Sequence, residues 1–250
     1  MTIALITGGS RGLGKASALA LASEGLDVVI TYKDNIAAAN DVIDEVHSIG
    51  QKAVAIQLDT ADVNSFDNFV LSISQILEAQ FNCTQFDYLL NNAGVGINLP
   101  FTDTTEETLT TLFDMHVKGP YLLTQKLLPL LRDGSAILNV SSGLTRFCFP
   151  GYSAYAMAKG AVEVMSRYMA NELGNRKIRV NTLAPGAIET DFGNGYVRDT
   201  SEVNSAIAAR TALGRVGLPD DIGAVVALLL SDKSHWINGQ RIEASGGMNL

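Results

Sequence analysis

The sequence is poor in several residue types, and each shortage excludes a class of protein. Its 250 residues include only two cysteines, Cys83 and Cys148, too few for a disulfide framework and typical of a reducing cytoplasm. Basic residues number 18 against 26 acidic ones, and this net charge of −8 argues against nucleic acid or an anionic membrane as the main partner. The longest apolar run, 224–230, is far short of the ~20 residues that span a bilayer, and no export signal is visible. We expect a soluble, cytoplasmic protein.

Apolar residues are abundant, and their pattern indicates the fold class. Hydrophobic residues make up 47% of the chain and charged residues 18%, which is typical of a globular protein with a large core. Apolar runs of strand length alternate with longer stretches of helical period near 12–24, 36–49, 62–79, 105–131, 152–174 and 219–231. This alternation predicts a three-layer α/β fold with a seven-stranded parallel sheet. The predicted strands are 3–7, 27–32, 52–57, 86–91, 136–141, 178–184 and 240–244.

The chain shows no internal repeat, low-complexity tract or linker, so we predict one domain over residues 1–250. One long irregular stretch, 186–211, lies between two predicted regular elements. A stretch of this length inside a domain is more often a lid or a binding loop than a linker. We therefore expect residues 186–211 to form a substrate lid.

A glycine-rich turn follows the first predicted strand and opens the first predicted helix. Glycines allow a sharp turn and allow backbone amides to approach a pyrophosphate, which then rests on the helix N-terminus. Because the turn opens the first βα unit of a parallel sheet, it favours a dinucleotide-binding, doubly wound Rossmann fold over an ordinary βα turn. Its residues are Thr7, Gly8, Gly9, Ser10, Arg11, Gly12, Leu13 and Gly14.

Together with further motifs, the spacing Thr-Gly-x-x-x-Gly-x-Gly resembles the short-chain dehydrogenase/reductase family. These motifs include an Asn-Asn-Ala-Gly sequence from Asn91, a serine 13 residues before a Tyr-x-x-x-Lys sequence, and Pro185-Gly186. The resemblance covers essentially the whole chain and implies a nicotinamide dinucleotide cofactor. The residues that it implies in cofactor binding are Gly8, Ser10, Arg11, Gly12, Leu13, Gly14, Tyr32, Lys33, Asp59, Asn92, Ala93, Gly94, Tyr155, Lys159, Pro185, Gly186, Ile188 and Thr190.

The resemblance also implies the catalytic set Ser142, Tyr155 and Lys159. On a helix, Tyr155 and Lys159 share a face, so the ammonium group is expected to favour the phenolate and to lower the tyrosine pKa toward neutrality. Such a tyrosine can exchange a proton with a carbonyl or alcohol oxygen. Ser142 follows the fifth predicted strand, where its hydroxyl can stabilise developing negative charge on the substrate oxygen.

The fourth helix departs from the family pattern. The family usually has an asparagine there that holds a water in a proton relay, and this sequence has His116. A neutral imidazole can hold a water through one nitrogen while the other bonds to the backbone, so we include His116 among the catalytic candidates. A packed histidine without a catalytic part is the alternative. We expect no metal site, because no His, Cys and acid cluster has ligand spacing.

The end of the second predicted strand bears on the choice of cofactor. NAD-binding proteins place an acid there for the ribose hydroxyls, whereas NADP-binding proteins place a cation there for the 2′-phosphate. Here Tyr32 stands at the place of the acid, Lys33 follows it, and Arg11 lies in the glycine-rich turn. Two cations in an acidic chain favour NADP(H) over NAD(H), although Asp34 is close by.

The substrate is less well defined by the sequence than the cofactor. Aromatic residues near Tyr155 and in 186–211 can line an apolar pocket, and the overall pattern resembles 3-oxoacyl and carbonyl reductases. We therefore expect an NADPH-dependent reductase that converts a small-molecule ketone or aldehyde to an alcohol. A sugar or alcohol dehydrogenase and a non-catalytic dinucleotide-sensing protein are the alternatives. The family commonly pairs its fourth and fifth helices between subunits, so we also expect a homotetramer.

Overall fold

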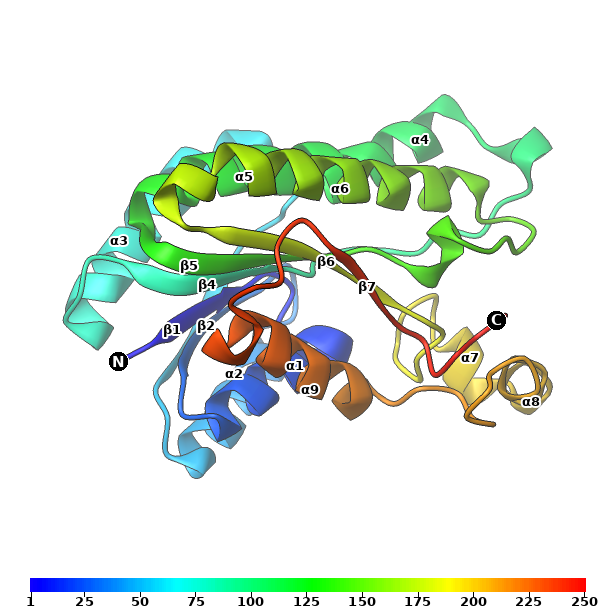
Figure 1. Cartoon of the computed structure of the whole chain (residues 1–250), viewed down its shortest axis with the longest axis horizontal. Coiled ribbons are helices and arrows are strands. Elements are labelled where there is room, and N and C mark those ends of the chain that lie inside the picture. Colours follow the sequence, from blue (N-terminus) through cyan, green and yellow to red (C-terminus); the bar gives the residue numbers. More distant parts are fainter.

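Seven parallel strands form the centre of the computed structural model, which describes all 250 residues. Their order across the sheet is β3-β2-β1-β4-β5-β6-β7, so the chain starts in the middle, winds to one edge and then to the other (Figure 1). The predicted seven-stranded parallel sheet is confirmed. The strands are β1 Ile3–Ile6, β2 Asp27–Tyr32, β3 Ala53–Gln57, β4 Phe86–Asn91, β5 Leu131–Val140, β6 Arg179–Pro185 and β7 Arg241–Ala244.

The inner strands are apolar on both sides because each side packs against a different core. In β1, Ala4 and Ile6 face one core, whereas Ile3 and Leu5 face the other. Successive side chains of a strand point to opposite faces of the sheet, and here both faces are buried. The sequences of these strands are therefore apolar throughout rather than alternately apolar and polar. The sheet is covered on both faces, which leaves its carboxyl edge as the place where loops gather and ligands bind.

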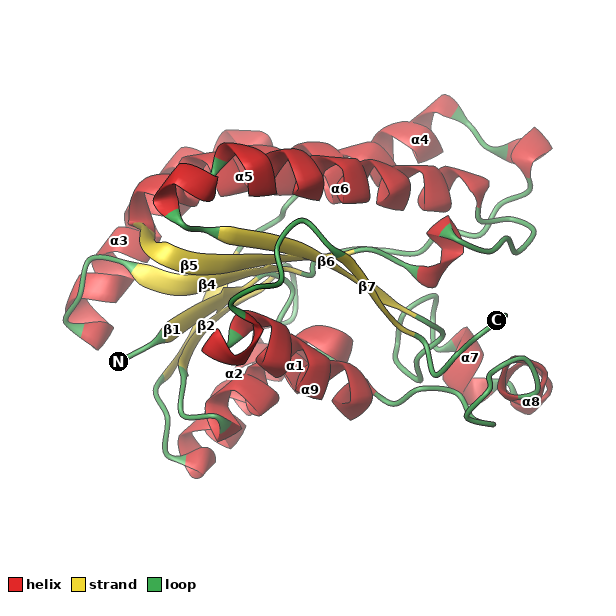
Figure 2. Cartoon of the chain, viewed as in Figure 1, coloured by secondary structure: helices red, strands yellow, loops and turns green.

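Helices cover the two faces in separate layers (Figure 2). The first core is completed by α1 Gly12–Ser23, α2 Ile36–Ile49 and α9 Pro219–Leu230. The second core is completed by α3 Phe66–Phe81, α5 Gly119–Leu127 and α6 Ser153–Glu172, with α4 Glu106–Phe113 preceding α5. None of these helices is both long enough and apolar enough to cross a membrane.

The prediction of a single helix over 105–131 is wrong. The chain forms α4, then a π-helical turn over Asp114–Lys118, then α5, and β5 begins at Leu131. Pro120 lacks the N–H that would bond to the carbonyl of His116 in a continuous α-helix, and the π turn lies directly before it. Pro129 ends the helical part in the same way, within a 3₁₀ turn. The π turn matters because it carries His116.

The stretch 186–211 is more ordered than expected. It contains the short helices α7 Tyr196–Asp199 and α8 Ser201–Ala208, which lie beyond the carboxyl end of β7 (Figure 1). Isolated bridges pair Ile188 with Gly217 and Thr211 with Met248, so both ends of the excursion are tied to the body of the protein. Between these ties the segment stands beside the carboxyl edge of the sheet.

Candidate active site

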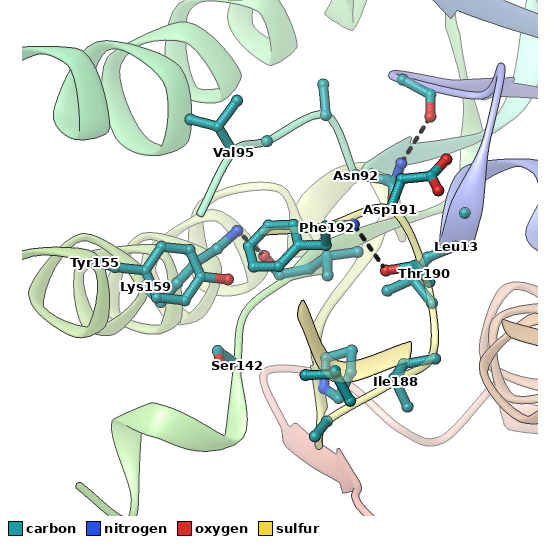
Figure 3. Close-up of a pocket in the computed structure, with 18 of the residues that line it drawn as sticks. Leu13, Asn92, Val95, Ser142, Tyr155, Lys159, Ile188, Thr190, Asp191 and Phe192 are labelled. Carbon is teal, nitrogen blue, oxygen red and sulfur yellow. Dashed lines mark hydrogen bonds between the residues drawn. The ribbon is translucent and has the colours of Figure 1, made fainter. Parts of the chain in front are cut away.

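One large cavity opens at the carboxyl edge of the sheet. Its volume is about 840 Å³, and it extends from the glycine-rich turn and the end of β2 to the 186–211 segment. Ser142, Tyr155 and Lys159 line this cavity (Figure 3). We call its part beside the glycine-rich turn the first half and its part beside Phe192 the second half. All the cofactor and catalytic residues expected from the sequence line this cavity except Gly14, which closes the turn behind it.

The glycine-rich turn places the N-terminus of α1 at one end of the cavity. Arg11 is the N-cap residue, and no side chain caps the first N–H groups of the helix, which leaves them available to an anion. Gly14 permits the close turn, because a Cβ there would lie 2.1 Å from the carbonyl oxygen of Gly8. The Arg11 guanidinium makes no ion pair or hydrogen bond within the chain.

The Asn-Asn-Ala-Gly sequence is tied to the first strand. Asn92 donates its side-chain amide to the carbonyl oxygens of Thr7 and Gly8, both at 3.0 Å. The hydroxyl of Thr7 accepts the backbone N–H groups of Asn92 and Ala93. These bonds hold the ends of β1 and β4 together and fix the loop that continues to Gly94 and Val95.

Lys33 is not the free cation that the sequence suggested. Its Nζ lies 2.8 Å from Oδ2 of Asp59, another expected cofactor residue. The hydrogen bond to Asp59 raises the pKa of Lys33. Burial opposes ionisation of Asp59, but the Lys33 hydrogen bond, the Ala61 N–H and the Lys33 charge outweigh it and lower the pKa of the carboxyl. Tyr32 ends β2 beside this pair and packs against the first core.

The other side of the cavity is formed by the end of β6 and the start of the 186–211 segment. Pro185, Gly186, Ile188 and Thr190 line the wall there, as expected. Thr190 is buried, and its hydroxyl accepts the backbone N–H of Phe192 at 3.1 Å (Figure 3). This bond sets the direction in which the segment leaves the sheet and carries Phe192 toward Tyr155.

Tyr155 and Lys159 lie one turn apart on the buried face of α6. The Nζ of Lys159 donates to the carbonyl oxygen of Val140 at 2.7 Å and lies 5.8 Å from the centre of the Tyr155 ring. Ser142 Oγ accepts the backbone N–H of Leu144 at 3.2 Å, so its own O–H can donate, as it does toward the phenol of Tyr155. In Figure 3 the phenol oxygen of Tyr155 is directed into the cavity. The three expected catalytic side chains are thus brought together.

The expected lowering of the Tyr155 pKa is not found. Burial raises the pKa of this phenol, a hydrogen bond with Ser142 opposes the rise, and Tyr152 adds to it. Burial also lowers the pKa of Lys159 to about 7. The Lys159 ammonium donates to Val140 and lies 5.8 Å from the ring centre, and burial of the phenol outweighs any effect of its charge. The neutral phenol is the stable form.

His116 is buried in the π turn and contacts Tyr155 edge-on, with 5.4 Å between ring centres. Its Nε2 lies 2.8 Å from the carbonyl oxygen of Val95, and a carbonyl can only accept, so Nε2 carries the proton. Nδ1 is then a buried acceptor without a partner in the chain. Burial, with a contribution from the charge of Lys159, lowers the pKa of His116 to about 3.

A supporting network behind Ser142 was missed by the sequence reasoning. Glu163 Oε1 accepts from Ser141 Oγ at 2.8 Å, from Thr145 Oγ1 at 2.7 Å and from Arg241 Nε at 2.8 Å. It thereby fixes both sides of the turn that carries Ser142. A signal was present, because Glu163 follows Tyr155 and Lys159 at the same four-residue spacing on one helix face.

The second half of the cavity is aromatic. The ring centres of Phe192 and Tyr152 lie 5.8 and 6.3 Å from that of Tyr155. The sequence reasoning anticipated aromatic side chains here but missed two further wall residues, Met248 and Arg210, which no local pattern marks. The aromatic residues of this half are Phe147, Phe149, Tyr152, Phe192 and Tyr196.

A family model described as enoyl-(acyl carrier protein) reductase matches residues 8–249. The hydroxynaphthalene reductase-like protein Arp2 of Metarhizium brunneum is 35% identical over 257 residues, which cover 98% of this chain and 94% of that protein.

Two solved structures are similar over almost their whole length. The promiscuous reductase LugOII, described as catalysing keto-reduction at C1 during lugdunomycin biosynthesis, has a TM-score of 0.94 and 37% identity, covering 100% of this chain and 98% of that one. The angucycline C-6 ketoreductase LanV, solved with bound NADP, has a TM-score of 0.93 and 33% identity, covering 99% and 95%. The chain therefore belongs to the short-chain dehydrogenase/reductase family and is an oxidoreductase.

Proposed function

We propose that the protein is an NADPH-dependent reductase that converts a ketone on a planar aromatic skeleton to an alcohol. The observation that carries this proposal is the position of Tyr155, between a dinucleotide-type turn and a cluster of aromatic side chains. The similarity to LanV with bound NADP and to the keto-reducing LugOII supports the same cofactor and reaction class. The similarity to a hydroxynaphthalene reductase-like protein supports an aromatic substrate.

The residues of the first half fit a dinucleotide that carries a 2′-phosphate. The uncapped start of α1 suits the pyrophosphate, and Arg11 offers an unpartnered guanidinium beside it. Lys33 offers a second cation, already shared with Asp59. Asn92, Thr190 and Lys159 would hold the nicotinamide side. When bound, NADPH supplies the hydride.

The protein's own residues manage the proton. Because burial raises its pKa, Tyr155 stays a neutral phenol at neutral pH and can donate its proton to the carbonyl oxygen during reduction. The O–H of Ser142, which also bonds to the Tyr155 phenol, would stabilise negative charge on the same oxygen. Protonated Lys159 lies close enough to the ring to stabilise the phenolate that remains.

His116 would serve as a neutral acceptor in the return of the proton. With a pKa of about 3 it carries no charge at neutral pH, so it does not act as an acid. Its unpartnered Nδ1 is suited to accept a hydrogen bond from a water. We propose that this water links His116 to Lys159 and so reprotonates Tyr155 from solvent.

The removal of one hydroxyl tests the proposal. Tyr155→Phe should keep the fold and NADPH affinity but lower kcat on aromatic ketones by about 10² to 10⁴-fold, because the proton donor is lost while packing is retained. Tyr88→Phe is the control, since Tyr88 lies on β4 and its hydroxyl makes no hydrogen bond. The measurement is NADPH absorbance with one- to three-ring ketones, together with NADPH titration of each variant. Undiminished turnover in Tyr155→Phe would remove this residue from the mechanism.

A further inference from the structure

Arg210 stands out among the arginines of the chain. Of the ten arginines, seven bond to carboxylates or backbone carbonyls, and only the side chains of Arg11, Arg167 and Arg210 have no partner. Two of these three line the cavity, at different places: Arg11 in the glycine-rich turn and Arg210 beside the aromatic half. Arg11 is explained by the proposed cofactor phosphate, whereas Arg210 is not.

The backbone of Arg210 is held while its side chain remains free. Its carbonyl accepts the N–H of Asn249 at 2.9 Å, and the next residue, Thr211, pairs with Met248. The guanidinium carbon lies 5.7 Å from the centre of the Phe149 ring. Phe149 is one of the aromatic residues of the second half of the cavity, so the exposed Arg210 guanidinium places a positive charge beside the space proposed for the substrate.

No acidic side chain of the cavity neutralises this charge. Asp59 is paired with Lys33, and Asp191 is paired with Arg198. The remaining acid of the lining, Asp34, directly follows Lys33 near the end of β2, in the half proposed for the cofactor. A guanidinium next to an aromatic ring, with all its N–H groups unpaired, is suited to a planar anion that it can bind with two parallel hydrogen bonds.

We propose that Arg210 is a specificity-determining residue that binds a carboxylate carried by the substrate at a distance from the reacting ketone. This inference rests on the proposed function and narrows its substrate class to aromatic keto acids. A carboxylate fits better than a phosphate, because a single guanidinium with no lysine beside it in the lining matches one negative charge rather than two. The aromatic rings would hold the skeleton, and Arg210 would set which end faces Tyr155.

A matched pair of compounds separates charge from shape. The probes are a tetralone carboxylate and its methyl ester as substrates, and a tetralin carboxylate, which has no ketone, as a ligand. With NADPH as the reductant, we expect KM for the acid to be about tenfold below that for the ester. Arg210→Gln should raise KM for the acid about tenfold and leave kcat and the ester unchanged, and Arg210→Lys should restore part of the difference. The control Lys177→Gln removes an exposed charge next to the amino end of β6, at the opposite edge of the sheet, and should change nothing.

Binding of the tetralin carboxylate, measured by calorimetry, makes the test independent of turnover. Loss of this binding in Arg210→Gln but not in Lys177→Gln supports the proposal. If Arg210→Gln changes KM equally for the acid and the ester, or changes neither, the role of Arg210 is overturned. Ketone reduction by the wild type would still support the proposed function. If no ketone is reduced, the proposed function fails, and calorimetry still decides whether Arg210 binds a carboxylate.

Discussion

Arg11 and Lys33 carry the same charge but are held differently. The Lys33 ammonium is paired with Asp59, so an incoming phosphate must share it with a carboxylate that also repels the phosphate. Arg11 has no partner and lies at the positive end of α1. The sequence treats the two cations as equivalent, whereas the ion pair of Lys33 leads us to expect the larger part of 2′-phosphate binding from Arg11.

We therefore expect unequal effects on cofactor affinity. Arg11→Ala should weaken NADPH binding about ten- to hundredfold, in line with the ~1.5–3 kcal/mol of a charge-assisted contact, and Lys33→Ala should weaken it only a few-fold. Both should leave NADH binding nearly unchanged. Adding Tyr32→Asp to the double variant should turn the preference toward NADH. Dissociation constants for both cofactors at two salt concentrations are the measurement. Equal wild-type affinity for NADH and NADPH, or NADPH affinity that ignores salt, would contradict this assignment.

His116 makes stability depend on pH in a defined window. Its pKa is about 3 in the folded protein and 6.5 in an unfolded chain, so between these values the unfolded chain binds the extra proton. Stability therefore falls as pH falls through this window. The contribution of His116 should amount to about 2 kcal/mol between pH 7 and pH 5.

The variant His116→Asn should lose this pH dependence, even if it is less stable at pH 7. Urea unfolding at pH 7 and pH 5 gives the measurement, and the contributions of Lys159 and the carboxylates are common to both proteins and cancel in the difference. His47→Asn is the control, because His47 is exposed on α2. If the free energy of unfolding changes with pH by the same amount in the wild type and in His116→Asn, the pKa of His116 is not lowered by folding.

At the level of elements, the sequence was sufficient where the signal is local. Most strands of the sheet follow apolar runs, and the first glycine-rich turn lies where its spacing placed it, but β5 begins at Leu131 rather than at residue 136 as predicted. The prediction of one helix over 105–131 was wrong because it followed the helical spacing of the apolar residues and gave too little importance to Pro120 and Pro129. Both prolines are visible in the sequence. The π turn, and the burial of His116 that follows from it, depend on packing and could not be predicted.

Long-range contacts set the remaining limit on prediction. Ser142, Tyr155 and Lys159 were found through a motif, but the Val95 carbonyl that sets the His116 tautomer comes from another loop, 21 residues earlier. Lys33 and Asp59 lie at the ends of neighbouring strands, and only the sheet order shows that they meet. The position of Arg210 beside Phe149 likewise depends on two segments that meet only in the folded chain.

Gly94 couples the loop after β4 to the π turn. A Cβ at this position would lie 2.5 Å from Cε1 and 3.1 Å from Nδ1 of His116, a buried ring that cannot move away freely. Gly94→Ala should therefore lower the free energy of unfolding by about 1–3 kcal/mol and reduce kcat by displacing His116 against Tyr155. Gly174→Ala is the control, because nothing lies within 4 Å of its Cβ, and it should stay within about 0.5 kcal/mol of the wild type. Equal urea midpoints for the two variants would show that the loop adjusts at no cost.

At the scale of the whole molecule, two exposed apolar surfaces remain without a partner. The first lies on α6 and includes Met157, Val164 and Tyr168, the last of these 66% exposed. The second includes Leu228 on α9 and Trp236, which is 92% exposed in the connection to β7. Helices α6 and α9 cover opposite faces of the sheet (Figure 1). Because an isologous interface joins a surface to its own copy, two such surfaces on opposite faces call for two different two-fold contacts.

We expect these two contacts to produce a homotetramer with three perpendicular two-fold axes. Light scattering at micromolar concentration should give about four times the 26.6 kDa chain mass. Val164→Asp should break the α6 contact and leave dimers joined through α9, and Leu228→Asp should leave dimers joined through α6, because an aspartate pair at either axis is desolvated and repulsive. The double variant should be monomeric and should still bind NADPH, since the cavity is built from one chain. Lys177→Gln, at neither surface, should remain a tetramer. A monomeric wild type would refute the assembly. If the wild type is a dimer and only one of the two substitutions dissociates it, the other surface takes no part in the assembly.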